Sequence, residues 1–161
     1  MSGILVSDRL QLIPVDPAAA NELSAGRCPL PAVEDYPHAD TSAAARLARN
    51  AMEIDNYVPG YGMYLIVSDW FVVGDIGFFA PPSERGVVEV GYGLAPSARG
   101  FGYATEALVC LAEWAFGNGT AVVLAETEAD NQASQEVLRK AGFMHSSTQG
   151  SVLRFLKTRE G

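Results

Sequence analysis

The 161-residue chain is poor in basic side chains. Eleven lysines and arginines stand against nineteen aspartates and glutamates, which gives a formal net charge of −8 and an isoelectric point of about 4.6. A protein that binds the phosphate backbone of a nucleic acid needs a basic face, so the excess of acidic residues argues against nucleic acid as a partner. It favours cationic partners such as amines, with simple solubility as the alternative explanation of the acidity.

Cysteine and histidine are also scarce, with two of each in the chain. Cys28 and Cys110 show no metal-ligand spacing, and a disulfide between them is not expected. His38 and His145 stand alone in the sequence. We therefore expect no metal site.

Long apolar runs are missing as well. No run approaches the roughly 20 residues that a helix needs to cross a bilayer. Residues 1–9 carry too short an apolar patch, and the wrong order of charges, for a signal peptide. These features predict a cytoplasmic protein with no membrane partner.

What the chain does contain is enough apolar residues for a core. Hydrophobic residues make up 48% of the sequence, so a single domain spanning residues 1–161 is expected. Short apolar or alternating runs predict strands, and apolar residues three and four apart predict helices. The expected strands cover 4–6 with 10–15, 63–67, 70–79, 87–94, 121–127, 143–147 and 152–156, and the expected helices cover 17–23, 41–54, 103–115 and 130–141.

The order of these elements predicts an α+β fold. Short polar turns between strands favour an antiparallel sheet. Strand 87–94, helix 103–115 and strand 121–127 make a β-α-β crossover, so these two strands should be parallel. Within strand 70–79, the pair Gly74-Asp75 predicts a turn or bulge, or alternatively a tight hairpin centred on these two residues.

The most informative stretch is the turn Arg99-Gly-Phe-Gly-Tyr-Ala104, between a strand and a helix start. Such a turn gathers backbone N–H groups at the positive end of a helix dipole, where phosphate binds. A dinucleotide fold is a competitor, with Glu126 as the ribose-reading acid, but the third glycine of its motif is missing. A Walker loop is excluded because no Gly-Lys-Ser/Thr follows.

The segment Arg99-x-x-Gly102-x-Ala104 resembles the Gln/Arg-x-x-Gly-x-Gly/Ala motif of the GNAT acetyltransferases. Five segments around it are similar to that family's in the same order: Asp8–Leu12, Val73–Gly77, Glu89–Pro96, Gly102–Ala107 and Asn131–Phe143. Together they resemble the Rim-type branch, which includes protein N-terminal alanine acetyltransferases. The resemblance implies a mixed, mostly antiparallel sheet of about six to seven strands, splayed between the fourth and fifth, with about four flanking helices.

The resemblance also implies acetyl-coenzyme A as the acetyl donor. Its pyrophosphate would lie on the turn, and its pantetheine arm in the gap between strands 87–94 and 121–127. For Asn131, a helix N-cap is an alternative role that is compatible with ligand contact. The implied cofactor-binding residues are Leu94, Ala95, Arg99, Gly100, Phe101, Gly102, Tyr103, Ala104, Thr105 and Asn131.

Acetyl transfer needs a base, because an acceptor ammonium with a pKa near ~10 must lose a proton before it attacks the thioester. Glu89 is the expected base, acting directly or through water, with Glu126 and Glu128 in reserve. Leu138 occupies the position where many relatives carry a tyrosine, so Ser134 is the expected proton donor to the leaving thiolate. The alternatives are a solvated strand carboxylate at Glu89 and a first-turn serine without a catalytic role.

The sequence does not identify the amine that accepts the acetyl group. The proline-rich loop 26–40 is a candidate wall for its site. A protein N-terminus, an amino acid, a polyamine and an aminoglycoside-like drug all satisfy the chemistry. Five acidic residues hint at a cation, or simply face water: Glu34, Asp35, Asp40, Glu53 and Asp55. The rival functions are a non-catalytic acyl-CoA-binding module and a nucleotide or phosphosugar binder, and the chain is expected to be a monomer or a homodimer.

Overall fold

The computed structural model describes residues 3–53 and 57–159. In this part of the chain, eight strands form one sheet in the order β1-β2-β3-β4-β5-β6-β8-β7, with four α-helices around it. The strands are β1 (Leu5–Val6), β2 (Gln11–Pro14), β3 (Met63–Ser68), β4 (Phe71–Phe78), β5 (Val87–Leu94), β6 (Val122–Glu128), β7 (Met144–Gln149) and β8 (Val152–Thr158). The helices are α1 (Pro17–Ser24), α2 (Ala39–Met52), α3 (Tyr103–Gly117) and α4 (Gln132–Lys140), and a 3-10 turn covers Pro96–Ala98.

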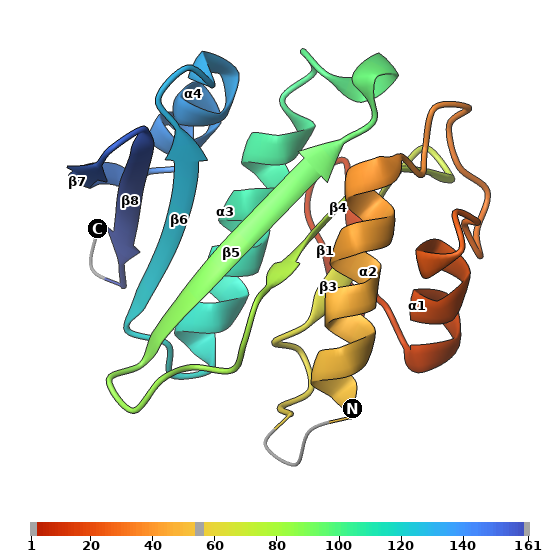
Figure 1. Ribbon diagram of the computed structural model, residues 1–161, viewed down its shortest axis with the longest axis horizontal. Helices are drawn as coiled ribbons and strands as arrows, with labels where there is room; N and C mark the ends of the chain where they lie inside the picture. Colours follow the sequence, from red (N-terminus) through yellow and green to blue (C-terminus); the bar gives the residue numbers. More distant parts are fainter. Residues whose placement is uncertain (1–2, 54–56, 160–161) are drawn as a thin grey trace.

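The sheet separates two helical layers (Figure 1). Helices α1 and α2 pack side by side on one face, while α3 runs behind β5 on the other. Alternation along β4 sets this arrangement, because successive side chains point to opposite faces. Asp75 bonds Thr41 of α2, whereas the Phe78 ring lies 6.2 Å from that of Trp114 on α3.

Strands β5 and β6 diverge, as the resemblance implied. They pair in parallel at Val87–Val122, Val88–Val123 and Glu89–Leu124, and the ladder ends there. From Val90 onward β5 pairs only with β4, and Figure 1 shows β5 and β6 spreading apart toward their carboxyl ends. The β-α-β crossover and the mostly antiparallel sheet are confirmed.

Two sequence-based expectations need correction. Segments 4–6 and 10–15 do not form a single opening strand, because the Ser7 N–H bonds the Leu10 carbonyl at 2.9 Å and folds β1 back on β2. The sheet therefore has eight strands. The alternative hairpin at Gly74-Asp75 is wrong, since both residues pair within continuous β4 and the bulge lies beside them, between Ile66 and Val67 of β3.

The tight turn lies instead at the β3–β4 connection. Asp69 and Trp70 link Ser68 to its cross-strand partner Phe71, and both have positive φ, 49° and 73°. A two-residue turn with this handedness matches the twist of a hairpin, and glycine usually occupies it. The sequence at this turn therefore gives little warning of its position.

The helices and the closing hairpin follow the predicted pattern. Helix α3 buries a stripe of small and branched residues against the sheet: Ala104, Ala107, Leu108, Leu111, Ala112 and Ala115. Helix α2 begins at Ala39, slightly earlier than expected, and is described to Met52, while Ile54 and Asp55 lie outside the described residues. Strands β7 and β8 form the expected hairpin.

Candidate active site

The turn before α3 is open at its backbone. Gly100 and Gly102 both have positive φ, 88° and 81°, a conformation that glycine adopts without strain. Gly102 caps α3 with no side-chain hydrogen bond. The N–H groups of the first helical turn have no partner within a helix, so this end of α3 presents donors and a positive dipole to an anion.

The loop between β1 and β2 holds this turn in place. Arg9 donates from Nη1 to the Phe101 carbonyl at 2.7 Å and from Nε to Glu106 Oε1 at 2.7 Å. Its guanidinium also lies 4.9 Å from the centre of the Tyr103 ring. Glu106 accepts further bonds from the Ser7 hydroxyl and the Arg9 backbone N–H. A contact between residues almost 100 positions apart therefore fixes the shape of the turn.

A cavity of about 1060 Å³ connects the turn with α2 across the middle of the sheet. Nine of the residues expected from the sequence line it: Leu94, Arg99, Gly100, Gly102, Tyr103, Ala104, Thr105, Asn131 and Ser134. Phe101 is exposed and is not among the lining residues, and its carbonyl accepts a hydrogen bond from Arg9. Glu89 does not line it either.

The edge of β5 that faces the gap has no strand partner beyond the ladder with β6, and the Leu94 carbonyl on it accepts from the Arg99 guanidinium. The Glu89 carbonyl accepts from Phe79 and the Ala95 N–H donates to Val73, so these odd-numbered residues turn their backbone toward β4. Because backbone direction alternates along a strand, Val90, Tyr92 and Leu94 turn theirs toward the gap that β6 has left.

Ala95, for which the resemblance implied contact with the cofactor, turns its backbone N–H toward β4 rather than toward the gap. It is fully buried, its N–H donates to Val73 at 2.8 Å, and its carbonyl accepts from Ala98 at 2.9 Å. Both of its backbone groups are thus already bonded within the chain. Leu94 is better placed for a ligand along this edge.

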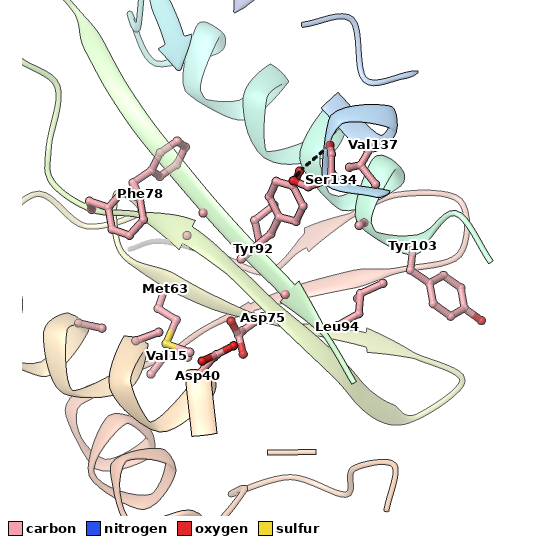
Figure 2. A pocket seen from close by; sticks show the side chains of 18 of the residues that line it. Val15, Asp40, Met63, Asp75, Phe78, Tyr92, Leu94, Tyr103, Ser134 and Val137 are labelled. Atoms are coloured by element: carbon pink, nitrogen blue, oxygen red, sulfur yellow. Dashed lines mark hydrogen bonds between the residues drawn. The ribbon is translucent and has the colours of Figure 1, made fainter. Parts of the chain in front are cut away.

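Ser134 and Tyr92 form a hydroxyl pair across the gap (Figure 2). Ser134 lies in the first turn of α4, and its Oγ is 2.8 Å from the Tyr92 hydroxyl oxygen. Burial raises the Tyr92 pKa, while the hydrogen bond with Ser134 opposes that rise. Asn131 accepts the Ser134 N–H at 3.1 Å and so caps α4, while also lining the cavity.

Glu89 lies at the closed end of the gap, on the last residue of β5 that pairs with β6. It is half-buried, and burial together with the nearby Glu126 carboxylate raises its pKa, while Arg154 opposes the rise. Arg154 is itself bonded to Glu126 at 2.7 Å. A smaller cavity of about 350 Å³ is lined by Val90, Glu126 and Glu128, so the two reserve carboxylates border one cavity that Glu89 does not line.

The α2 side of the large cavity holds a buried carboxylate that the sequence did not single out. Asp75 on β4 is 8% exposed, and its Oδ2 accepts from the Tyr36 hydroxyl at 2.9 Å and from Thr41 Oγ1 at 3.2 Å. His38 and Asp40, from the start of α2, line the cavity beside it. The only signal in the sequence was an aspartate inside an apolar strand.

The acidic residues expected near the acceptor do not act together. Asp40 lines the large cavity, but Glu34 and Glu53 are exposed and do not. Asp35 bonds the Ser97 N–H and hydroxyl, which ties the loop to the 3-10 turn and lowers the Asp35 pKa. Asp55 lies outside the described residues.

Comparison with known proteins identifies the family and the fold. The family model described as an acetyltransferase (GNAT) domain matches residues 9–144. The chain belongs to the GNAT acetyltransferase family. It is 32% identical over 120 residues to the uncharacterized N-acetyltransferase YjdG of Bacillus subtilis, and this match covers 71% of each chain. The protein is accordingly an acyltransferase.

Solved GNAT structures share the whole fold. A RimL ribosomal L7/L12 α-N-protein acetyltransferase in complex with coenzyme A matches with a TM-score of 0.70 and 20% identity, covering 96% of this chain and 97% of the other. The microcin C7 self-immunity acetyltransferase MccE, solved with acetyl-CoA and AMP, matches with a TM-score of 0.68 and 14% identity, covering 94% and 93%. At these identities the likeness concerns the fold.

The lack of a tyrosine on α4, expected from the sequence, is offset by a hydroxyl group on β5. Leu138 is fully buried in the core, so the α4 position of the usual tyrosine carries no hydroxyl. Tyr92, on β5 instead, offers one beside Ser134. Within residues 3–53 and 57–159, no group of three or more His, Cys, Asp or Glu is arranged to hold a metal ion. In the same part of the chain, no helix is long and apolar enough to cross a membrane.

Proposed function

We propose that this GNAT domain moves the acetyl group of acetyl-CoA to a primary amine. The observation that carries the proposal is the unpaired edge of β5 at Val90, Tyr92 and Leu94, which leads directly to the open N-terminus of α3. An edge of free peptide groups suits an amide-containing arm, and a helix N-terminus suits a diphosphate. RimL and MccE, which share the fold, have been solved with coenzyme A and with acetyl-CoA.

The donor would be held by backbone more than by side chains. Peptide N–H groups of residues 99–105 suit the pyrophosphate, and the Arg99 guanidinium, now bonded to the Leu94 carbonyl at 3.2 Å, adds positive charge. Lys140 lines the same cavity and suits a further phosphate. The β5 edge at Leu94 and Tyr92, with Asn131 opposite, suits the amides of the pantetheine arm.

The chemistry is a direct displacement in which Glu89 accepts a proton from the acceptor ammonium, directly or through water. The freed amine attacks the thioester carbonyl, a C–N bond forms, and the C–S bond breaks. A backbone N–H of β5 at the gap would stabilise the oxyanion. Ser134, hydrogen-bonded to Tyr92, would return a proton to the leaving thiolate.

The cradle is tested by calorimetric titration of acetyl-CoA into the wild type and into Thr105→Asp. Thr105 lines the cavity in the first turn of α3, where an aspartate favours the helix but repels a diphosphate. We expect affinity to fall at least about tenfold, the equivalent of roughly 1.4 kcal/mol, with no loss of thermal stability. Thr105→Asn is the uncharged control. Absence of acetyl-CoA binding by the wild type would refute the proposal.

A non-catalytic acyl-CoA-binding module is the second candidate, and the buried Leu138 is the observation that favours it. Release of free coenzyme A thiol, assayed over a broad panel of primary amines that includes a peptide N-terminus, separates the two. Binding of acetyl-CoA without release of thiol with any amine would support the module. Thiol release that depends on the amine would support the transferase.

A further inference from the structure

The α2 half of the large cavity contains acceptor atoms without a chain partner. Asp75 Oδ2 is bonded to Tyr36 and Thr41, but no described residue donates a hydrogen bond to Oδ1. The Nε2 atom of His38 is buried and has no hydrogen-bond partner either. Buried polar atoms are almost always paired, so the unpartnered His38 Nε2 beside the buried Asp75 carboxylate indicates that this end of the cavity takes a polar ligand.

Two carboxyl groups, those of Asp75 and Asp40, lie close together at this place. Burial raises the pKa of Asp75, and the Asp40 carboxylate raises it further, while the Tyr36 and Thr41 bonds and His38 oppose the rise. Figure 2 shows Asp40 of α2 directed toward Asp75 of β4 across the cavity wall. A buried carboxylate is stabilised by a cation, and an ammonium has three N–H donors. Asp75 and Asp40 offer carboxylate oxygens to it, and the unpartnered Nε2 of His38 lies beside them.

The floor between this cluster and the reaction centre is open at Gly93, whereas a Cβ placed on Gly91 would meet the Phe79 ring at 2.7 Å. Gly93 pairs with Asp75, and Gly91 pairs with Gly77 two residues nearer to Glu89, all on the same face of the sheet. A Cβ placed on Gly93 would meet only the His38 ring, at 4.0 Å. Two residues along a strand span roughly 7 Å. The opposite wall is α2, which presents Ala44, Ala48 and Ala51 to the cavity.

From these contacts we infer that the acceptor is a linear amine with a second positive charge, held by Asp75, His38 and Asp40, while the nitrogen that is acetylated lies at the level of Gly91, about 7 Å along β5 toward Glu89. A short α,ω-diamine, or the end of a polyamine, has this chemistry: two ammonium groups joined by an apolar chain that fits between a glycine floor and an alanine wall. This inference rests on the proposed acetyl transfer and names the substrate class of that site.

The test compares 1,4-diaminobutane and 1,5-diaminopentane with butylamine and pentylamine. For the wild type we expect kcat/KM to be at least about tenfold higher for each diamine than for the monoamine of equal length, as a charged hydrogen bond supports. In Asp75→Asn the amide oxygen still accepts the Tyr36 and Thr41 bonds, but the charge is gone. The diamine-to-monoamine ratio should then fall toward one. Equal use of both amines by the wild type, or an unchanged ratio in Asp75→Asn, would overturn the inference.

A steric variant covers the case in which Asp75→Asn does not fold. Gly93→Ala adds one methyl group to the open floor without a positive φ to strain the strand. We expect it to raise the KM for diamines severalfold with thermal stability retained, and an unchanged KM would count against this groove. Glu113 is an exposed carboxylate on α3, and Glu113→Gln is the matched control. It should leave the diamine-to-monoamine ratio of kcat/KM unchanged at both chain lengths.

Direct binding separates this inference from the proposed function. Either diamine is titrated by calorimetry into the wild type saturated with coenzyme A. Binding that Asp75→Asn abolishes supports the charge subsite even where turnover is absent. Absence of diamine binding, together with acetylation of monoamines, overturns the subsite and leaves the acetyl transfer standing. Failure to bind acetyl-CoA at all overturns both.

Discussion

At the scale of single residues, the proposed reaction depends on the protonation of two side chains, Glu89 and Ser134. Glu89 must be ionised to take a proton, and its pKa is set by burial and two charged neighbours on the open face of the sheet. Ser134 must keep a proton to give, and its only side-chain contact among the described residues is with Tyr92. The Glu89 pKa and the hydrogen bond of Ser134 can each be changed by substituting a neighbouring residue, with Glu89 and Ser134 themselves left in place.

The pH dependence of turnover should respond to Glu126 and Arg154 in opposite directions. The base acts when deprotonated, so kcat at saturating acceptor rises with pH through the Glu89 pKa. Glu126→Gln removes a negative neighbour, lowers the Glu89 pKa and should move the acidic limb to lower pH. Arg154→Gln removes the opposing cation and should move it to higher pH. An acidic limb of the pH profile that stays at the same pH in both variants would exclude Glu89 as the titrating base.

Removal of the carboxylate itself gives a larger effect. Glu89→Gln should lower kcat by about 100-fold or more, since a positioned base contributes roughly that much. Acetyl-CoA affinity should be preserved, because Glu89 does not line the cavity that would hold the donor. Equal losses in kcat and in acetyl-CoA affinity would assign Glu89 a structural role.

The hydroxyl pair gives a paired experiment. Ser134→Ala removes the proposed donor, and Tyr92→Phe keeps the ring but leaves Ser134 without its 2.8 Å partner. We expect kcat to fall in both, more in Ser134→Ala, with a stability loss of about 1 kcal/mol for Tyr92→Phe. Single-turnover kinetics checks the order of the two effects. A greater loss in Tyr92→Phe would transfer the role of donor to the tyrosine.

At the scale of elements, the binding turn depends on a segment far away in the sequence. The β1–β2 loop supplies Ser7 and Arg9, and both bond Glu106 in the first turn of α3. Arg9 also bonds the Phe101 carbonyl inside the turn. The shape of the phosphate site is therefore a tertiary property, although its sequence motif is local.

This clamp should make stability depend on pH. Partial burial alone would raise the Glu106 pKa, but the bonds from Ser7 and Arg9 outweigh it and lower the pKa below its ordinary value of 4.5. The stabilisation is thus complete above that value and is lost as pH falls through the lower, folded-state pKa. Glu106→Gln should unfold at lower urea than the wild type at pH 7, and the difference should narrow when the midpoint is measured again well below pH 4.5.

The matched control for this clamp is Glu113→Gln on the same helix, which should leave the urea midpoint unchanged at both pH values. Acetyl-CoA affinity should also fall in Glu106→Gln, because the turn loses its support. A urea midpoint of Glu106→Gln that differs from the wild type equally at both pH values would contradict the pKa assignment.

At the scale of the whole molecule, one open sheet joins two half-sites. The gap between β5 and β6 runs from Glu89 toward α3 and α4, while the α2 face carries Asp75 and the glycine floor. A ligand in the gap would bridge strands that share only three paired positions. Coenzyme A should accordingly stabilise the whole fold, by about 2.7 kcal/mol at 100 times its Kd, seen as a rise in melting temperature.

The half of the proposed site that would hold acetyl-CoA was predictable, because its residues are contiguous in the sequence. The turn at 99–104, the strand before it and the helix after it follow from glycine placement and apolar periodicity, and the structure has them at the expected positions. The direction of the Ala95 backbone was also predictable, since alternation along β5 decides which backbone groups face β4 and which face the gap.

The acceptor half was not predictable in this way. Asp75, Tyr36 and His38 come from a strand, a loop and a helix start, and only tertiary packing brings them together. A single aspartate in an apolar strand and a lone histidine carry no local pattern. The separation of β1 from β2 was missed for a related reason, because the Ser7–Leu10 bond that folds the hairpin has no glycine to mark it.

The central claim is that the gap between β5 and β6 is where acetyl-CoA gives its acetyl group to an amine. The most direct measurement is mass spectrometry of the amine after incubation with the wild type and acetyl-CoA, with free thiol measured in parallel. The account predicts one acetylated amine for each coenzyme A released, and about 100-fold less of both with Glu89→Gln. Acetyl-CoA that binds but leaves every amine unmodified would contradict it.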